Sequence, residues 1–435
     1  MTRIGRMSAD EKKEEVTGLC VLFFIRFYPL TPRHPRSILQ EIPMPTPDFD
    51  PFRFDDLLTP AQSALRDQVR DYMESVVRPQ INDYWERAEM ARDLALGLGK
   101  LPIPIIGGTL TGYGLAGLDN VSSGLVKYEL CRVDGSVSTL FGVHSGLAID
   151  SISLFGSQEQ KERWLPQMVA MEKLGAFGLT EPERGSDAAH VQTTARRVGD
   201  YWVLNGQKRW IGNGTIADIL IIWARDEGGR FGGFVLENPR DLPGFQAETI
   251  TGKIAKRAVH QANISLSDVH IPVADRLAHC NSFRDLNAVL DYTRAGVAWE
   301  AVGLAAGCYE IALDYACRRE QFGKPIASYQ LIQAKLVEMA AELSQMQLLV
   351  WRLAQLMDAG QASAGQISLA KQSCAAKARK MAGQAREILG GNGILIENHA
   401  ARLFTDAEAT YTYEGTNEIN LLIAGREITG LSAFV

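Results

Sequence analysis

The chain has 435 residues, a length that predicts two or three domains of ordinary size. It is 46% hydrophobic and 22% charged, as soluble globular proteins are, and its net charge of −6 without a long basic run argues against nucleic acid as a partner. The six cysteines form no CxxC pair and the seven histidines form no cluster, so we expect reduced thiols, a cytoplasmic location and no metal site.

The first 50 residues do not read as a folded domain. The apolar stretch 19–24 is too short to span a bilayer. Acidic residues such as Asp10 and Glu11 suit neither a signal peptide nor a mitochondrial presequence. The C-terminal residues 432–435 are not a peroxisomal signal. We therefore expect residues 1–50 to be a poorly ordered extension, without a membrane span.

Residues 51–172 are predicted to form a helical domain. Thr59 can cap a helix that begins at Pro60, and Leu65 and Val69 then lie on one apolar face. The Gly/Pro-rich stretch 101–117 interrupts this region. Further helices are expected over 120–132, 142–154 and 157–171.

Residues 173–281 are predicted to form a compact β-domain. Short runs of β-branched and aromatic residues are divided by the turn pairs Gly199-Asp200 and Asn205-Gly206. This alternation extends from about residue 192 to residue 273.

Residues 282–435 are predicted to form a helical bundle. Long periodic stretches are separated by short glycine-containing breaks, the pattern of antiparallel helices. The expected helices cover 285–318, 329–358, 363–389 and 417–430. The fold class is therefore mainly α with a central β-domain.

Two glycine-rich stretches lack the context of a nucleotide-binding motif. The GxGxxG of residues 112–117 neither follows a clear strand nor opens a βαβ unit, so we interpret it as a loop. The stretch 390–393 follows a helix, where glycine ends helices by tolerating positive φ. Neither stretch alone predicts a cofactor.

Four other segments suit a flat cofactor and a base, and each also has an ordinary structural explanation. The polar turn 177–187 can offer N–H groups and hydroxyls to a heterocycle, or be a simple capped turn. Trp210 can stack on a ring or lie in the core. Arg318 and Arg319 suit a diphosphate or the end of their own helix. Burial of Glu414 among apolar neighbours would raise its pKa, as a general base for a weak carbon acid requires.

Together, from about residue 52 to residue 434, these segments resemble the acyl-CoA dehydrogenase family. The resemblance is closest to its glutaryl-CoA dehydrogenase branch and to the related plant short-chain acyl-CoA oxidase. The shared motifs are LTEP followed by GSD (179–187), LNGQKRWIGN (204–213), QFG.P (321–325), LGGNGI (389–394) and YTYEGT (411–416).

The resemblance implies an N-terminal helical domain, a middle β-barrel and a C-terminal four-helix bundle, with FAD between the last two. The residues expected to hold FAD are Phe177, Leu179, Thr180, Ser186, Trp210, Ile211, Gly212, Arg319, Gln330, Glu387, Gly390, Gly391 and Thr416. Arg319, Gln330 and the 387–391 turn would reach the FAD of a neighbouring subunit. The resemblance thus implies a homodimer at least, and usually a homotetramer.

The resemblance also implies a role for Glu414 as the base that removes a proton from Cα while Cβ delivers hydride to flavin N5. A backbone N–H and a ribityl hydroxyl of the flavin would hold the thioester carbonyl. Some branches carry the base on a bundle helix, and the matching position is near Thr293, which cannot serve. The residues expected to contact the acyl-CoA are Ser138, Thr139, Ser186, Arg294 and Gly415.

Two departures from the family pattern bear on the substrate and the electron acceptor. Ser138 stands where glutaryl-specific enzymes have an arginine for the distal carboxylate, which favours a short neutral acyl-CoA over glutaryl-CoA. Gly212 stands where many dehydrogenases have a hydroxyl residue, which would open the flavin to oxygen. We expect oxidation to the trans-2-enoyl-CoA, as in β-oxidation, with an electron-transfer flavoprotein as acceptor. The alternatives are a short-chain acyl-CoA oxidase, a glutaryl-CoA dehydrogenase and, last, a non-catalytic flavin- or CoA-binding module.

Overall fold

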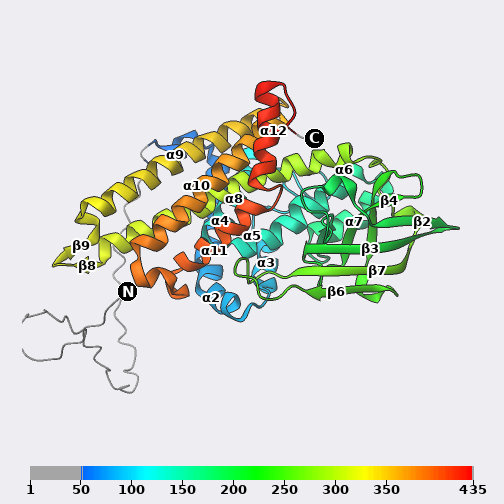
Figure 1. The fold of residues 1–435 in the computed structure, drawn as a ribbon, viewed down its shortest axis with the longest axis horizontal. Coiled ribbons are helices and arrows are strands. Elements are labelled where there is room, and N and C mark those ends of the chain that lie inside the picture. Colours follow the sequence, from blue (N-terminus) through cyan, green and yellow to red (C-terminus); the bar gives the residue numbers. More distant parts are fainter. Residues whose placement is uncertain (1–49, 51, 434–435) are drawn as a thin grey trace, which may run out of the picture. The chain divides into compact units, whose positions relative to one another are not determined.

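The computed structural model describes residue 50 and residues 52–433, so the predicted extension over residues 1–50 lies outside the described residues apart from Asp50. The described chain passes from helices to a sheet and back to helices, as the sequence predicts (Figure 1).

Helices α1, α4 and α7 begin where the sequence predicts, whereas the helix predicted over 142–154 begins at Gly135, where Asp134 caps it, and α2 and α3 were not predicted. Thr59 closes a capping box with Gln62 at the start of the first helix, and Ser157 caps α7. From Gly135 to Phe155 the chain is one helical run, in which the π-helical turn η4 (Val143–Ile149) joins α5 to α6. The helices are α1 (Pro60–Tyr72), α2 (Arg78–Arg87), α3 (Arg92–Gly97), α4 (Asn120–Val133), α5 (Gly135–Gly142), α6 (Asp150–Phe155) and α7 (Gln158–Val169).

The β-domain is one curled sheet of seven strands in the order β1-β4-β2-β3-β7-β6, with β5 on β4. The strands are β1 (Gly175–Gly178), β2 (Thr194–Val198), β3 (Tyr201–Gly212), β4 (Ile219–Asp226), β5 (Phe231–Glu237), β6 (Phe245–Thr249) and β7 (Gln261–Pro272). The ladder between β3 and β7 shifts register between Lys208 and Ile211, where Trp210 has a φ of 63°. A bulge of this kind re-aims a side chain, and Trp210 is accordingly exposed.

The C-terminal helices form the predicted bundle. They are α8 (Phe283–Arg318), α9 (Gln330–Asp358), α10 (Ala364–Ile388), α11 (Ala400–Thr412) and α12 (Asn417–Thr429), with the small ribbon β8 (Glu320–Gln321) and β9 (Lys324–Pro325) between α8 and α9. The sequence predicted all of these helices except α11. Gly390 follows α10 with a φ of 59°, which confirms the predicted helix-ending glycine.

Helix α8 is the centre of the bundle and packs against α4 and α10 (Figure 1). Within the described residues, α8 and the run Gly135–Phe155 are long and apolar enough to cross a membrane. Because 83% and 67% of these two windows are buried inside the protein, their apolar character is that of core helices. This packing places α4, η4 and α8 around one point, the candidate site.

Candidate active site

The loop after α11 holds Glu414 in a left-handed conformation. Glu414 has a φ of 54° and the next residue, Gly415, has a φ of 81°. The buried Lys371 of α10 donates hydrogen bonds to the carbonyl oxygens of Gly415 at 2.9 Å and of Tyr411 at 3.2 Å. Thr416 then caps α12 by accepting from the N–H of Ile419. The direction of the Glu414 side chain is therefore fixed from both sides of the loop.

The Glu414 carboxylate lies against helix α8. Thr293 donates its hydroxyl hydrogen to Oε2 of Glu414 at 2.8 Å. Burial raises the pKa of Glu414 above its ordinary value, the Thr293 hydrogen bond and the nearby Arg294 oppose this rise, and Glu300 reinforces it. A carboxylate in this setting is a stronger base than one in water.

A second buried carboxylate, that of Glu300, lies on the same side of α8 as Thr293, seven residues after it. Glu300 accepts a hydrogen bond from the Tyr413 hydroxyl at 2.6 Å and another from the Ser138 hydroxyl at 3.1 Å. Lys256, from the β-domain, reaches the Tyr413 oxygen at 3.2 Å. The predicted substrate residue Ser138 is therefore buried and already bonded within the protein.

Of the other predicted substrate residues, some lie next to Glu414 and others do not. Arg294 lies beside Glu414 and forms an ion pair with Asp291 at 2.6 Å, and its Nε has no partner among the described residues. The Thr139 hydroxyl donates to the carbonyl of Gly135. Ser186 is exposed in the turn before β2. Among them, Arg294 and Gly415 are the two placed next to Glu414.

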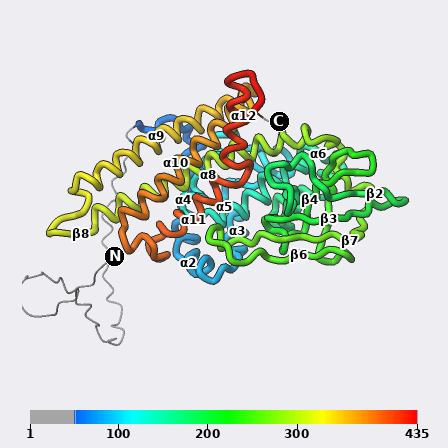
Figure 2. The backbone as a smooth tube through the Cα atoms, viewed as in Figure 1, coloured from blue at the N-terminus to red at the C-terminus, as the bar shows by residue number. Residues whose placement is uncertain are grey.

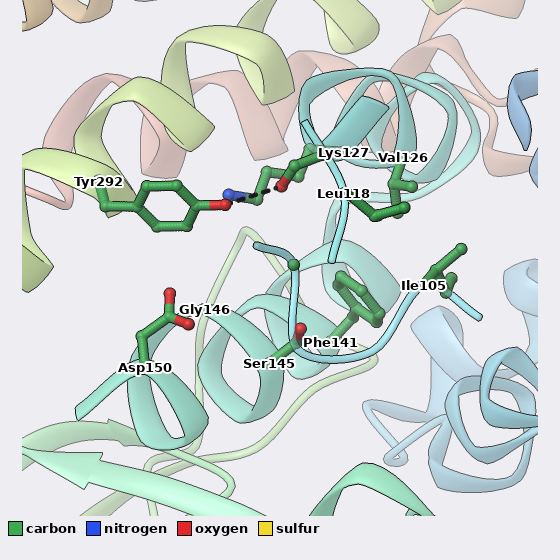
Figure 3. A pocket seen from close by; sticks show the side chains of 11 residues that line it. Ile105, Leu118, Val126, Lys127, Phe141, Ser145, Gly146, Asp150 and Tyr292 are labelled. Carbon is green, nitrogen blue, oxygen red and sulfur yellow. Dashed lines mark hydrogen bonds between the residues drawn. The ribbon is translucent and has the colours of Figure 1, made fainter. Parts of the chain in front are cut away.

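A small cavity, with room for about one water molecule, lies between α4, η4, α6 and α8 (Figure 3). Gly146 lines it, and a Cβ built on Gly146 would lie 4.0 Å from Cγ2 of Thr293. Gly146 thus lies next to Thr293, the hydrogen-bond partner of Glu414, but neither Thr293 nor Glu414 lines the cavity. Lys127, Asp150 and Tyr292 also line it.

The predicted flavin residues of the β-domain lie on β1 and β3 and on the loop after β1. Phe177 packs inward on Trp223, with ring centroids 5.6 Å apart, and Leu179 and Ile211 are also buried. Thr180 is half-buried, while Trp210 is 51% exposed. Trp210 is thus available to stack on a flat ring. The more common case, a tryptophan buried in the core, does not apply here.

Gly212 lies at the end of β3, against η4. A Cβ at Gly212 would come within 2.8 Å of Cγ2 of Val143. A hydroxyl-bearing residue at 212 would therefore require Val143 to move.

The remaining predicted flavin residues lie at the other end of the bundle. They are Arg319, Gln330, Glu387, Gly390 and Gly391, all exposed. Figure 2 shows the end of α8 and the start of α9, near β8, far from β2 and β3. A Cβ on Gly390 or Gly391 would meet nothing within 4 Å, so their backbone is open to a ligand.

Four buried charged residues of this region were missed from the sequence: Lys127, Asp150, Glu300 and Lys371. All four are charged residues within apolar helical stretches. A charge in such a stretch is unusual, and it was the one signal in the sequence that could have identified them. Lys127 and Glu300 both act on Glu414 or its neighbours through their charge. The site is therefore more polar than the motifs alone indicate.

Comparison with known proteins identifies the family. The chain matches the acyl-CoA dehydrogenase N-terminal domain over residues 59–172, the middle domain over 176–269 and the C-terminal domain over 283–429. It is 34% identical over 383 residues to an acyl-CoA dehydrogenase of Bacillus subtilis (strain 168), covering 86% of this chain and 99% of that protein. It is also 34% identical over 372 residues to the mitochondrial short-chain specific acyl-CoA dehydrogenase of Mus musculus, covering 83% and 88% of the two chains.

Two solved structures of glutaryl-CoA dehydrogenase from Mycobacterium smegmatis are also similar. One is 40% identical with a TM-score of 0.84, covering 88% of this chain and 97% of the other. The second, in complex with FADH2, is 36% identical with a TM-score of 0.85, covering 88% and 98%. The predicted family and three-domain fold are thereby confirmed: the chain belongs to the acyl-CoA dehydrogenase family, whose members are oxidoreductases.

Proposed function

We propose that the protein uses FAD to oxidise a short, neutral acyl-CoA to the trans-2-enoyl-CoA, with Glu414 as the catalytic base. The observation that supports this most is the placement of Glu414. Its carboxylate accepts a hydrogen bond from Thr293 on helix α8, and partial burial raises its pKa above the ordinary value.

The basicity of Glu414 is suited to a weak carbon acid. A proton on Cα next to a thioester is far less acidic than a carboxylic acid, so a base with a raised pKa has an advantage. Burial supplies that rise, and the bond from Thr293 keeps the carboxylate ionised and oriented. Lys371 fixes the loop that carries Glu414 through two carbonyl oxygens. The enolate-like charge formed on the thioester oxygen needs donors of its own, as an oxyanion hole provides.

FAD, when bound, accepts the hydride that leaves Cβ. The exposed Trp210 and the half-buried Thr180 would hold its ring on one subunit. Arg319 and Gln330 of a neighbouring subunit would hold its diphosphate side, so the proposal includes a homotetramer or a smaller assembly with shared sites. The glutaryl-CoA dehydrogenase neighbour in complex with FADH2 supports the choice of cofactor.

A neutral substrate is favoured over glutaryl-CoA, although glutaryl-CoA dehydrogenases are among the similar structures. Ser138 offers no positive charge, and its hydroxyl is bonded to the buried Glu300. A distal carboxylate placed there would meet another carboxylate, which is unfavourable without a cationic partner. The short-chain specific relative supports a short chain.

For the electron acceptor we propose an electron-transfer flavoprotein, with molecular oxygen as the second candidate. The argument for oxygen is that Gly212 offers no hydroxyl to the flavin, although Val143 fills the space that a larger side chain at 212 would take. Hydrogen peroxide formed one-to-one with the enoyl product would establish an oxidase, and turnover without oxygen uptake would reject one.

The proposed function is tested by anaerobic titration of the FAD-loaded protein with butyryl-CoA and longer acyl-CoAs. We expect the flavin absorbance near 450 nm to bleach, as reduced flavin forms. A protein that binds FAD but is bleached by no acyl-CoA would instead be a flavin- or CoA-binding module.

A further inference from the structure

Helix α8 holds two consecutive residues of the loop that carries the proposed base. Thr293 donates a hydrogen bond to Glu414, and Glu300 accepts one from the Tyr413 hydroxyl at 2.6 Å. Thr293 and Glu300 are seven residues apart, which is about two helical turns, so their side chains lie on the same face of α8. The carboxylate of Glu300 is therefore fixed on the side of α8 where Glu414 lies.

Glu300 is buried, and both of its side-chain oxygens already accept hydrogen bonds. It is 6% exposed; Oε2 accepts from Tyr413, and Oε1 accepts from the Ser138 hydroxyl of α5 at 3.1 Å. Two donors to one carboxyl group favour its ionised form. Burial and the charge of Glu300 raise the pKa of Tyr413 well above its ordinary value, so the tyrosine keeps the hydrogen that it donates. Glu300 thus has a negative charge and is not placed to take the substrate proton itself.

A cation from the β-domain stabilises this negative charge. The loop between β6 and β7 places the Lys256 amine 3.2 Å from the Tyr413 oxygen and 5.3 Å from the centre of the Tyr413 ring. The same amine donates to the carbonyl oxygen of Gly135 at 2.9 Å, and a Cβ at Gly135 would come within 2.5 Å of it, so glycine leaves the room that the amine needs. Burial alone would lower the pKa of Lys256, but the acidic groups around it, Tyr413 and Glu300 among them, raise it well above its ordinary value. The amine is therefore a cation.

Several other charged and titratable groups face the two carboxylates. Those that act on Glu414 are Arg294 and Glu300 of α8, Lys371 of α10 and Lys127 of α4. Those that act on or respond to Glu300, besides Glu414, are Tyr413, Lys256, Lys127 and Cys131 of α4, a thiol whose pKa is raised by burial, so that it stays uncharged. Among the named groups that act on Glu414, Glu300 is the one with a negative charge. Its removal therefore has an effect on the base opposite in sign to that of the cations.

We propose that Glu300 is a positioning residue for the reaction, and that its negative charge favours uptake of the Cα proton by Glu414. Tyr413 and Lys256 keep Glu300 ionised for this purpose. The inference rests on the proposed function, because it concerns the base that this function assigns. Two like charges close together repel each other, and the repulsion falls when one of them gains a proton. Glu414 becomes neutral when it takes the proton, whereas Glu300 keeps its charge, so proton transfer relieves the repulsion.

Glu300→Gln tests this, because the amide keeps the shape of the side chain and removes its charge. On the FAD-loaded protein, the protonated carboxyl group of Glu414 is followed as a function of pH by infrared difference spectroscopy, and its band is assigned by its absence in Glu414→Gln. We expect the midpoint of this titration to lie about one pH unit lower in Glu300→Gln than in the wild-type protein. An unchanged or higher midpoint overturns the proposal.

The rate of anaerobic flavin bleaching by butyryl-CoA gives a second readout. A weaker base accepts a proton less readily, so the rate at high pH should fall several-fold while the pH midpoint of the rate moves down. A substitution that only disturbs the structure lowers the rate at every pH and leaves the midpoint in place, and that result counts against the proposal. The infrared titration needs no turnover. It therefore distinguishes this result from failure of the proposed function, in which no acyl-CoA bleaches the flavin of the wild-type protein.

The matched control is Asp314→Asn, which removes a carboxylate from the same helix fourteen residues further along, about 21 Å away. It should leave both midpoints at their wild-type values, and a shift as large as that of Glu300→Gln would contradict the proposal. If Glu300→Gln does not fold, Glu300→Asp and Glu300→Asn are compared instead, since these two side chains have the same length and differ in charge. The asparagine variant should then have the lower midpoint, and equal midpoints for the two contradict the proposal.

Discussion

The hydroxyl of Thr293 donates a hydrogen bond of 2.8 Å to Oε2 of Glu414, so helix α8 and the loop after α11 meet at one carboxylate. The resemblance to the family singles out both positions, because in some branches the base stands near Thr293. In this chain, the residue at that position hydrogen-bonds the proposed base, Glu414. A donor to an ionised carboxylate lowers its pKa, so Thr293 opposes the effect of burial.

Replacing Thr293 with valine should move the pH dependence of flavin reduction to higher pH. Loss of the donor destabilises the ionised form of Glu414, so its pKa rises further. Since the reaction needs the ionised base, the variant should be slower at low pH and recover at high pH. A hydrogen bond to a charged group contributes about 1.5–3 kcal/mol, which corresponds to a shift of about one to two pH units. The measurement is the rate of anaerobic flavin bleaching between pH 6 and pH 10.

The matched control is Thr293→Ser, which keeps the hydroxyl and loses one methyl group. Its pH profile should stay near that of the wild-type protein. Equal profiles for the valine and wild-type proteins would show that this bond does not tune the base.

Glu414→Gln should keep FAD and the fold but lose flavin bleaching with every acyl-CoA. The amide has nearly the same shape and cannot accept a proton, so the loss should be at least about 10²–10⁴-fold. The control is Glu418→Gln, an exposed acid in the first turn of α12, for which we expect the wild-type rate. Bleaching by Glu414→Gln at the wild-type rate would assign the base elsewhere.

The helices that the sequence predicts well are those with a start signal and a sustained apolar face. Thr59 and Ser157 cap α1 and α7 where expected. Helix α11 was missed because His399 precedes it in a left-handed conformation and offers no side-chain cap. Local sequence therefore predicts helices that have caps and misses those fixed by packing.

The sequence predicts the candidate site less completely than it predicts the helices. Glu414 could be chosen because the YTYEGT motif resembles the family, but its partner Thr293 comes from a helix more than one hundred residues away. Glu300 and Lys127 are charged residues inside apolar helices, and the interaction between their charges depends on how α4 packs on α8. Periodicity gives the face of a helix, whereas the contacts between faces arise only in the folded protein.

A buried ion pair links the first helical region to the bundle and predicts a stability effect. Arg402 of α11 and Asp134 are both fully buried, and Arg402 Nη1 lies 2.5 Å from Oδ2 of Asp134. Asp134 also caps α5 through the N–H groups of Ser136 and Val137. Arg402→Met would leave the buried carboxylate without its cation, so we expect a loss of about 3–5 kcal/mol in the free energy of unfolding.

Urea unfolding of the FAD-saturated protein measures this loss. The control is Arg87→Met, whose ion pair with Glu89 is exposed on both sides and should contribute less than about 1 kcal/mol. A similar small loss for both variants would contradict this prediction. It would mean that the protein rearranges so that Asp134 gains water or another partner when Arg402 is removed.

Arg319 provides the test of a flavin site shared between subunits. Its side chain is exposed and forms no ion pair with the described residues, whereas its neighbour Arg318 pairs with Asp314 of the same chain. Arg319→Ala should therefore lose FAD on purification, seen as a lower ratio of absorbance at 450 nm to that at 280 nm, while Arg318→Ala should keep it. Trp210→Ala, on the β-domain, should weaken FAD binding in the same way.

Mixing the two defects distinguishes a shared site from one built by a single chain. If Trp210 of one subunit and Arg319 of another hold the same FAD, a mixed pair of Trp210→Ala and Arg319→Ala subunits contains one site with both defects and one intact site. Co-expression with two different affinity tags, followed by sequential purification, isolates these mixed pairs. We expect them to bind FAD at the intact site with wild-type affinity, measured by fluorescence titration. If one chain builds the whole site, every subunit in the mixture carries a defect, and no tight site is recovered.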